Sequence, residues 1–408
     1  MKIGLFTDVY TPSVSGVVTS VTMLKNALEK LGHQVYIVTA NLENNKFIYN
    51  ADEHIIRIPG IKIGIYDYRL TGIYSIKAAK MISKWKLDVI HSHTEFGIGG
   101  FARIIAKQLN IPLVHTYHTM YEDYIKHVIG GYFSEASNKI VEYFTTFLCD
   151  KTISELIVPT PKTHDLFKQK YKITRNIHVI PSGIEIERFY KERFSTNVIN
   201  AYKKDYKLNK DDFIILYLGR LGQEKNIEFM VENHGHLVKY DKRFKLLIVG
   251  DGPEMNKLKE LVTKYDITDN VIFTGKIQWD LVPIYYQLAD VFVNPSTSET
   301  QGLTVIEAMA SSKPAICIND PSYNDMVINN YNGLFFNNHK EYLNIMIDLF
   351  KHPKKLIELG EKARESVTSY STTHYAERVL AVYQLANNFK PKMPYYLIDK
   401  LKNMLKGE

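Results

Sequence analysis

Cysteine and long apolar runs are scarce in this sequence. Only Cys149 and Cys317 occur among 408 residues, which excludes a disulfide framework and favours a reducing cytoplasm. No run of about 18 apolar residues occurs, so no transmembrane helix is expected, and Asp8 comes too early for a secretory signal peptide. The 45% hydrophobic and 23% charged residues are ordinary for a globular protein. The length predicts two to three domains.

The net charge of +7 is concentrated in the first half of the chain. Residues 1–195 carry 24 basic and 18 acidic side chains, whereas residues 196–408 carry 27 and 26. This asymmetry favours an anionic partner: a nucleic acid, a membrane surface or a phosphorylated substrate. No nucleic-acid-binding motif accompanies the basic residues, so no nucleic-acid partner is expected.

Two series of alternating strands and helices follow one another. The first series is expected to contain strands at Lys2–Asp8, Gln34–Thr39, Asp88–His93 and Pro112–His118, with helices over Val17–Leu31 and Gly100–Leu109. After a polar stretch at 188–211, the second series is expected to contain strands at Phe213–Leu218, Lys245–Val249, Val271–Phe273, Val291–Asn294 and Pro314–Ile318. The alternation predicts an α/β fold with two Rossmann-like, doubly wound domains that face a central cleft.

The segment 294–310 contains a strand end, a polar loop and a helix start. The free N–H groups near Gln301, Gly302 and Leu303 would suit a phosphate, because unpaired donors and the helix dipole act together. Glu299 lies in the loop, and Glu307 leans back from inside the helix. The two carboxylates can therefore accept hydrogen bonds from the hydroxyls of one ligand, which indicates a nucleotide sugar. The alternative is a capped helix with solvated acids.

Arg220 and Lys225 follow the strand that is expected to end at Leu218. Both would lie at the carboxyl edge of the sheet, where open α/β folds bind ligands. Fixed cations at that edge can stabilise the charge that develops on a departing diphosphate without a metal. The alternative is a surface salt bridge.

Four histidines are candidate metal ligands: His91, His93, His115 and His118. The helical HExxH pattern and paired cysteines are both missing. The sequence therefore predicts no metal site and no cofactor.

Taken together, these motifs resemble the retaining GT-B glycosyltransferases of family 4. The likeness covers nearly the whole chain and rests on Gly16, Ile180–Glu185, Gly219-Arg220, Lys225-Asn226, Gly250–Glu254, Glu299 and Glu307. It implies an N-terminal acceptor- and membrane-binding domain over 1–195, a nucleotide-sugar-binding domain over 196–384, and a tail over 385–408 that packs back on the first domain. Two positions depart from the family pattern, since Thr300 and Ser15 stand where glycines are usual.

The resemblance also implies roles for single residues. Arg220 and Lys225 would hold the diphosphate of the donor, Glu307 the ribose and Glu299 the transferred hexose. Gly16, which has no Cβ, would let the first loop approach the phosphate closely. His118 matches the family histidine near the C6 hydroxyl of the donor and the reacting centre.

Within family 4, His93–Phe96 and His115–Tyr124 resemble the bacterial diacylglycerol α-glucosyltransferases. This likeness implies transfer of glucose from UDP-glucose to the 3-hydroxyl of 1,2-diacylglycerol. Alternative acceptors are an already glycosylated lipid and a soluble or protein-bound molecule. A catalytically silent GT-B partner subunit is an alternative of another class.

Residues 61–87 support a lipid acceptor independently, because they carry six basic residues and one acidic residue. On a helical wheel Lys77, Lys80 and Lys84 gather on one side, while Ile82 and Trp85 fall on another. A basic amphipathic helix of this kind can lie on an anionic leaflet. The alternative is an outer helix that packs on the sheet with its lysines in water. The membrane interpretation predicts an enzyme on the inner, cytoplasmic face of the cell membrane.

Overall fold

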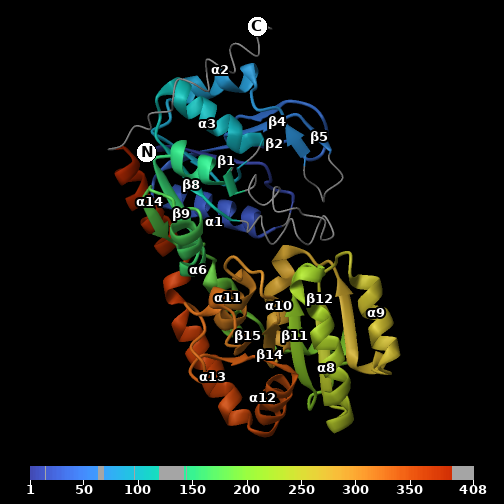
Figure 1. Ribbon diagram of the computed structural model, residues 1–408. Helices are drawn as coiled ribbons and strands as arrows, with labels where there is room; N and C mark the ends of the chain where they lie inside the picture. Colours follow the sequence, from blue (N-terminus) through green and yellow to red (C-terminus); the bar gives the residue numbers. More distant parts are fainter. Residues whose placement is uncertain (14, 63–68, 96, 119–141, 144, 388–408) are drawn as a thin grey trace.

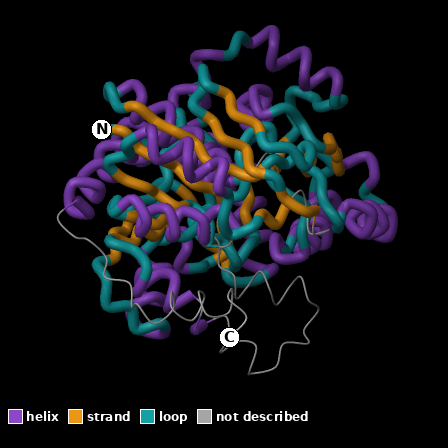
Figure 2. Tube along the Cα trace, turned by 90° about the horizontal axis from the view of Figure 1, so that it is seen from above, coloured by secondary structure: helices purple, strands orange, loops and turns teal. Residues whose placement is uncertain are grey.

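The computed structural model describes the chain apart from residues 14, 63–68, 96, 119–141, 144 and 388–408. It has two lobes, each a sheet of mainly parallel strands with helices on both faces (Figure 1). Viewed from above, the strands run through the interior and the helices surround them (Figure 2). Among the described residues, no helix combines the length and the apolarity that a membrane crossing needs.

The first lobe is built on an eight-stranded sheet of order β10-β9-β8-β7-β1-β2-β4-β3. Its strands are β1 (Lys2–Thr7), β2 (Gln34–Ala40), β3 (Ile48–Asn50), β4 (Ile55–Ile58), β7 (Val89–Ser92), β8 (Leu113–Thr116), β9 (Glu155–Val158) and β10 (Ile177–Val179). All pair in parallel except β3 with β4. A separate hairpin joins β5 (Gly60–Lys62) and β6 (Arg69–Thr71). The helices are α1 (Gly16–Lys30), α2 (Ile76–Trp85), α3 (Gly97–Leu109) and α6 (Pro161–Asp165).

The second lobe contains a six-stranded parallel sheet of order β13-β12-β11-β14-β15-β16. Its strands are β11 (Phe213–Leu218), β12 (Phe244–Val249), β13 (Val271–Gly275), β14 (Val291–Asn294), β15 (Ala315–Ile318) and β16 (Gly333–Phe336). The helices are α7 (Thr196–Asp205), α8 (Ile227–Tyr240), α9 (Met255–Lys264), α10 (Val282–Leu288), α11 (Leu303–Ala310), α12 (His339–Lys351) and α13 (Pro353–Ser366).

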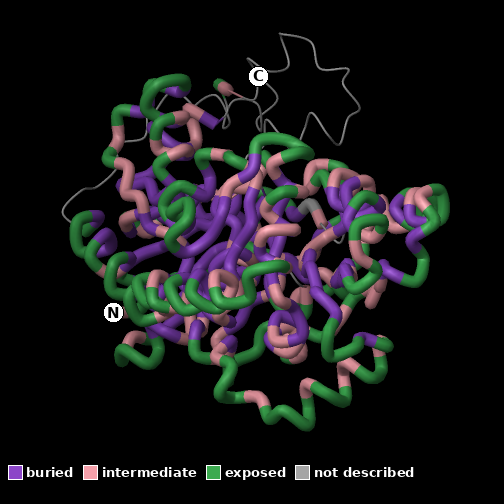
Figure 3. The backbone as a smooth tube through the Cα atoms, turned by 90° about the horizontal axis from the view of Figure 1, so that it is seen from below, coloured by how far each residue is buried: buried purple, intermediate pink, exposed green. Residues whose placement is uncertain are grey.

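The strands form where the sequence predicts short apolar runs. In β1 every residue after Lys2 is buried, and Leu5 pairs with Ile37 of β2 on one side and with His91 of β7 on the other. Such continuous burial is typical of parallel strands that are covered on both faces. Figure 3 shows the buried strands in the interior and the exposed residues on the outer helices.

The chain passes between the lobes twice, and the two passages lie side by side. Ile180 packs in the core of the first lobe and Ile184 in the core of the second. The chain returns near Ser371, which forms a parallel bridge with Ile184. A Cβ atom on Gly183 would come within 3.0 Å of atoms of three residues of the returning segment, so glycine is required at this crossing.

The last described helix, α14 (Thr372–Asn387), completes the first lobe. Tyr375, Val379 and Tyr383 pack with the buried residues of β1 and α1, and Figure 1 shows the helix beside the sheet of this lobe. The predicted domain limits, 195 and 385, lie later in the chain than both crossings. Phe189, at the start of the polar stretch 188–211, already belongs to the core of the second lobe. The tail over 388–408 lies outside the described residues.

Candidate functional site

The predicted donor-binding residues of the second lobe lie in loops after β11 and β14, which are neighbouring strands. Lys225 Nζ donates to Glu299 Oε1 at 2.6 Å, so residues 74 positions apart in the sequence are in direct contact. Arg220 forms a hydrogen-bonded ion pair with Glu224. The structure thus brings the predicted cations and one predicted carboxylate to the carboxyl edge of the sheet, where open α/β folds bind ligands.

Several hydrogen bonds hold the loop that carries Glu299. The hydroxyls of Ser296 and Ser298 both donate to the carbonyl oxygen of Glu224 at 3.2 Å. Tyr323 donates to the carbonyl oxygen of Ser296 at 2.7 Å. The two serine bonds tie the loop after β14 to the loop after β11, and the Tyr323 bond ties it to the segment after β15.

The N-terminus of α11 faces the first lobe. Gly302 precedes this helix with a φ of +76°, in the left-handed region, and no side chain caps the helix start. A Cβ atom on Gly16 would lie 3.9 Å from Leu303 Cδ1. The start of α1 therefore lies beside the start of α11. Because both helix ends carry partial positive charge, their convergence favours an anion between the lobes.

Glu307 is 8% exposed and lies within α11. Tyr286 donates a hydrogen bond of 2.8 Å to Glu307 Oε2. Burial raises the pKa of the Glu307 carboxyl to about 7, although the Tyr286 hydroxyl and the charge of Arg188 act in the opposite direction. Near neutral pH this residue therefore changes between an acid that can donate a hydrogen bond and a carboxylate that only accepts.

The side chain of Gln301 joins the two lobes. Its Oε1 accepts from the backbone N–H of Ser182 at 2.9 Å, and its Nε2 donates to the Ser182 carbonyl at 3.0 Å. The Gln301 side chain therefore lies at the lobe junction, while the prediction for the donor site concerns the backbone N–H groups near Gln301. Thr160 and Lys162 of the first lobe also bond to the loop before α11. Sequence reasoning missed both residues, because their partners lie far away in the chain.

His118 follows β8 and contacts His93, which follows β7. Its Nε2 lies 3.0 Å from His93 Nδ1, and the two rings are nearly parallel with centroids 5.3 Å apart. Burial lowers the pKa of His118 to about 4, so the imidazole is neutral at physiological pH. His91 is bonded to the hydroxyls of Tyr383 and Thr116 at 2.7 Å each. Across the part of the chain that the structure describes, no three His, Cys, Asp or Glu side chains are grouped to hold a metal ion.

The predicted membrane-binding lysines, Lys77, Lys80 and Lys84, are all exposed on α2. Ile82 and Trp85, on another side of the helix, are buried in the core of the first lobe. The helix therefore packs on the sheet through its apolar side and presents a basic face outward. At the start of the helix, Ile73 and Ile76 expose 58% and 66% of their surface.

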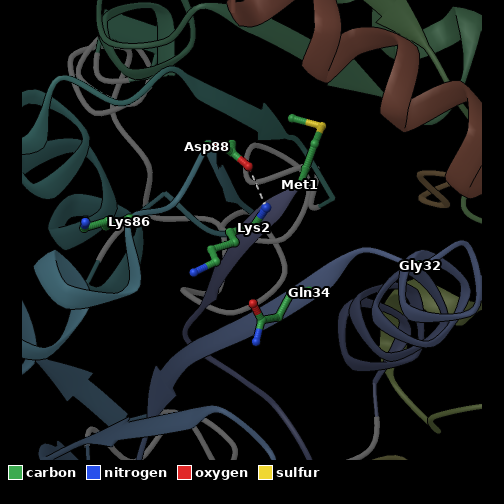
Figure 4. Close-up of a pocket in the computed structure, with 6 residues that line it drawn as sticks. All are labelled: Met1, Lys2, Gly32, Gln34, Lys86 and Asp88. Carbon is green, nitrogen blue, oxygen red and sulfur yellow. Dashed lines mark hydrogen bonds between the residues drawn. The ribbon is translucent and has the colours of Figure 1, made fainter.

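A hollow of about 440 Å³ lies at the opposite, amino-terminal edge of the first sheet (Figure 4). It is lined by Met1, Lys2, Gly32, Gln34, Lys86 and Asp88. The backbone N–H of Lys2 donates to Asp88 Oδ2 at 2.7 Å, as the figure shows. Ligands of open α/β folds bind at the other edge, so we assign this hollow no role in the reaction.

Comparisons with known proteins agree with this geometry. Residues 14–188 match the family model "Glycosyltransferase Family 4", and residues 198–366 match "Glycosyl transferases group 1". The chain is 35% identical to the alpha-monoglucosyldiacylglycerol synthase of Acholeplasma laidlawii, over 94% of this chain and 96% of that protein. The chain belongs to glycosyltransferase family 4. A Streptococcus pneumoniae protein of the same name is also 35% identical to this family 4 chain, over 96% of it and 88% of the relative.

Solved structures share the fold of this family 4 glycosyltransferase. A glycosyltransferase from Rickettsia africae superposes with a TM-score of 0.74 at 20% identity, covering 94% of this chain and 98% of that one. Anabaena HepE in complex with UDP superposes with a TM-score of 0.71 at 16% identity, covering 94% and 100%. The predicted α/β GT-B fold with two Rossmann-like domains is confirmed.

Proposed function

We propose that this family 4 glycosyltransferase moves glucose from UDP-glucose to the 3-hydroxyl of 1,2-diacylglycerol and forms an α-glucosyl glycolipid. The contact between Lys225 and Glu299 carries the proposal. It joins a cation for a diphosphate with a carboxylate for sugar hydroxyls, in the loop that leads into the uncapped start of α11. The choice of acceptor is supported by two relatives of nearly full length that are alpha-monoglucosyldiacylglycerol synthases.

In the proposed reaction the acceptor hydroxyl attacks the donor from the side on which the diphosphate leaves. The glucose–phosphate bond breaks as the new glycosidic bond forms, and the departing diphosphate accepts the proton of the hydroxyl. The anomeric configuration is thereby retained. Arg220, Lys225 and the N–H groups beside Gly302 stabilise the charge on the leaving group. Gly16 lets the first loop approach that group.

The sugar and the ribose are held by separate groups in this scheme. Glu299 accepts hydrogen bonds from the glucose hydroxyls and Glu307 from the ribose hydroxyls. His118, which is neutral, forms a hydrogen bond near the C6 hydroxyl of the donor. The charge stabilisation belongs to protein groups, so we expect a chelator such as EDTA to leave the rate unchanged.

The lipid acceptor is proposed to be reached from an anionic membrane surface. Lys77, Lys80 and Lys84 lie on the exposed face of α2, where they can meet anionic headgroups. Ile73 and Ile76 are exposed beside them and can enter the leaflet. The protein would then act on the cytoplasmic face of the cell membrane.

The proposal is tested with purified protein, radiolabelled UDP-glucose and diacylglycerol in vesicles with and without anionic lipid. We expect α-glucosyldiacylglycerol as the product, identified by its anomeric proton coupling, and faster synthesis on anionic vesicles. If the rate does not depend on vesicle charge, the result contradicts the proposal that the protein acts at an anionic membrane surface. Transfer only to a glycosylated lipid or a soluble acceptor contradicts the diacylglycerol assignment. If the protein transfers sugar from no nucleotide sugar, the result contradicts an active enzyme and favours the alternative of a catalytically silent partner subunit.

A further inference from the structure

We propose that Lys162, in the first lobe, is a positioning residue that sets the sugar-binding geometry of Glu299 in the second lobe. The inference rests on the proposed function, since the role of Glu299 toward the donor hexose belongs to that proposal. Lys162 is not among the residues that are proposed to contact the donor. The inference predicts that a change at Lys162 alters binding of the sugar separately from binding of the nucleotide.

Lys162 lies in the first turn of α6, which follows β9. Its ammonium group donates to Asp320 Oδ1 at 2.8 Å, to Ser322 Oγ at 3.0 Å and to the carbonyl oxygen of Thr297 at 3.3 Å. All three acceptors belong to the second lobe. The side chains of Lys162 and Asp320 are 25% and 13% exposed, so this contact is better shielded from water than an ordinary surface ion pair.

The hydroxyl of Ser322 connects Lys162 to Glu299. Its oxygen lies 2.6 Å from Asp320 Oδ1 and 2.7 Å from the carbonyl oxygen of Glu299. A serine hydroxyl has one hydrogen to donate, so these two acceptors compete for it. Because Lys162 satisfies the charge of Asp320 and also donates to Ser322 Oγ, the serine hydrogen is left for the Glu299 carbonyl. Without Lys162, the charged carboxylate of Asp320 takes that hydrogen and the Glu299 backbone loses its anchor.

Other contacts from the first lobe fix the same loop and make its position depend on the lobe junction. Thr160 Oγ1 donates to the carbonyl oxygen of Thr300 at 3.1 Å. Gln301 exchanges two hydrogen bonds with the backbone of Ser182. The residues on both sides of Glu299 are therefore held from the opposite lobe, and the Lys162 bond to Thr297 extends this support toward the start of the loop.

Two of the groups assigned to the nucleotide are held within the second lobe, and the third, Lys225, bonds to the side chain of Glu299 rather than to the backbone carbonyl that Ser322 anchors. Arg220 pairs with Glu224, and Glu307 accepts from Tyr286, and all four residues lie in the second lobe. A change at Lys162 should therefore alter the recognition of the hexose and leave the recognition of the nucleoside diphosphate nearly intact. A general loss of packing between the lobes would instead weaken the binding of both UDP and UDP-glucose.

The test measures the dissociation constants of UDP and of UDP-glucose by calorimetry, which needs no lipid acceptor. We expect Lys162→Met to raise the dissociation constant of UDP-glucose at least tenfold and to change the dissociation constant of UDP less than twofold. Lys168→Met is the matched control, since the Lys168 ammonium group donates to the carbonyl oxygens of Ile173 and Arg175 within its own lobe. This control should change neither constant. Lys162→Arg keeps the charge and the donors and should restore most of the affinity for UDP-glucose.

The outcomes separate this inference from the proposed function. Equal weakening of both ligands, or unchanged binding of both, overturns the positioning role of Lys162. Failure of the unaltered protein to bind either ligand overturns the proposed donor instead. If Lys162→Met does not fold, Asp320→Asn removes the charge that competes for the Ser322 hydrogen; with Lys162 present it should leave UDP-glucose binding within threefold, and a tenfold loss would contradict the competition.

Discussion

At the scale of single residues, the two cations that are proposed to hold the diphosphate each pair with a carboxylate. Lys225 holds Glu299, and Arg220 holds Glu224. In the proposed reaction, the oxygens of the diphosphate would replace these carboxylates as partners of the two cations, while the sugar hydroxyls would bond to Glu299. The pairing keeps opposite charges together in a partly buried place, where an unpaired charge is costly.

Removal of one site residue should slow the reaction strongly without unfolding the protein. We expect Lys225→Ala and Glu307→Ala each to lower the rate of transfer about a hundredfold, since the loss of one such stabilising contact costs about 3 kcal/mol. Initial rates with the labelled donor measure the effect. Lys257→Ala is the control, because Lys257 pairs with Glu228 at the surface of the same lobe. Near-normal turnover in either site variant would remove that residue from the mechanism.

The pH dependence of nucleotide binding should report Glu307. Burial raises the pKa of this carboxyl from 4.5 to about 7, and a ribose hydroxyl that donates requires the ionised form. We therefore expect the affinity for UDP to rise between pH 6 and pH 8 and a proton to be released on binding. Calorimetry in two buffers of different ionisation enthalpy measures that proton. An affinity that falls over this range would contradict the assignment, and Glu307→Gln should abolish the slope.

The same shift fixes the sign of the effect on stability. Because the pKa of Glu307 is raised in the folded state, folding favours the protonated acid. Its contribution to the free energy of unfolding is fully present below pH 4.5, the pKa in the unfolded chain, and is lost as the pH rises through about 7. Glu307→Gln cannot ionise and should keep its stability over this range. The free energy of unfolding of the variant, relative to that of the parent protein, should therefore be higher at pH 8 than at pH 5. Urea unfolding at the two pH values measures the difference, and an equal effect at both would contradict it.

At the scale of elements, local pattern predicted the strands whose sequence is both apolar and long enough. Phe213–Leu218 is a strand in the structure with the predicted bounds. β9 and β10 were not predicted, because the polar residues Glu155 and His178 interrupt their short apolar runs. Lys162 could not be found either, since nothing local marks a partner 158 residues away. The sequence predicted Lys225 at the carboxyl edge of the sheet, and the structure adds its contact with Glu299 there.

The glycine before α11 should be required by backbone conformation. Gly302 has a φ of +76°, and a Cβ atom there would come 3.1 Å from the ring of Tyr323. Gly302→Ala is therefore expected to cost about 1–2 kcal/mol for the left-handed backbone and more for the contact. Gly275→Ala is the matched control, because Gly275 has a φ of +70° and open space around it. Chemical unfolding should find Gly302→Ala the less stable variant; the reverse order would contradict the contact.

At the scale of the whole molecule, the basic face of α2 lies on the first lobe, while the donor loops lie on the second. A membrane that holds the first lobe would still leave the donor loops accessible to water-soluble nucleotide. The sequence predicted this basic face from residue spacing, and burial of Ile82 and Trp85 agrees with the helix position. Whether the face meets lipid stays a prediction.

Loss of the three lysines should weaken membrane binding. Each lysine near an anionic leaflet contributes about 1 kcal/mol, so the triple change of Lys77, Lys80 and Lys84 to Gln should lower vesicle affinity about a hundredfold. Flotation with anionic vesicles measures it. Exposed lysines of the second lobe, Lys210, Lys340 and Lys354, provide a control with the same change in net charge. Equal losses in the two triple variants would show that total charge alone governs binding.

The late return of α14 has a consequence for how the protein is made. Tyr375 and Tyr383 fill the core beneath β1 and β7, yet they are synthesised after the entire second lobe. On the ribosome the first lobe must wait with an uncovered apolar face until nearly all of the chain has emerged, whereas the second lobe can finish folding earlier. A chain that is cut short before α14 leaves that face open to aggregation.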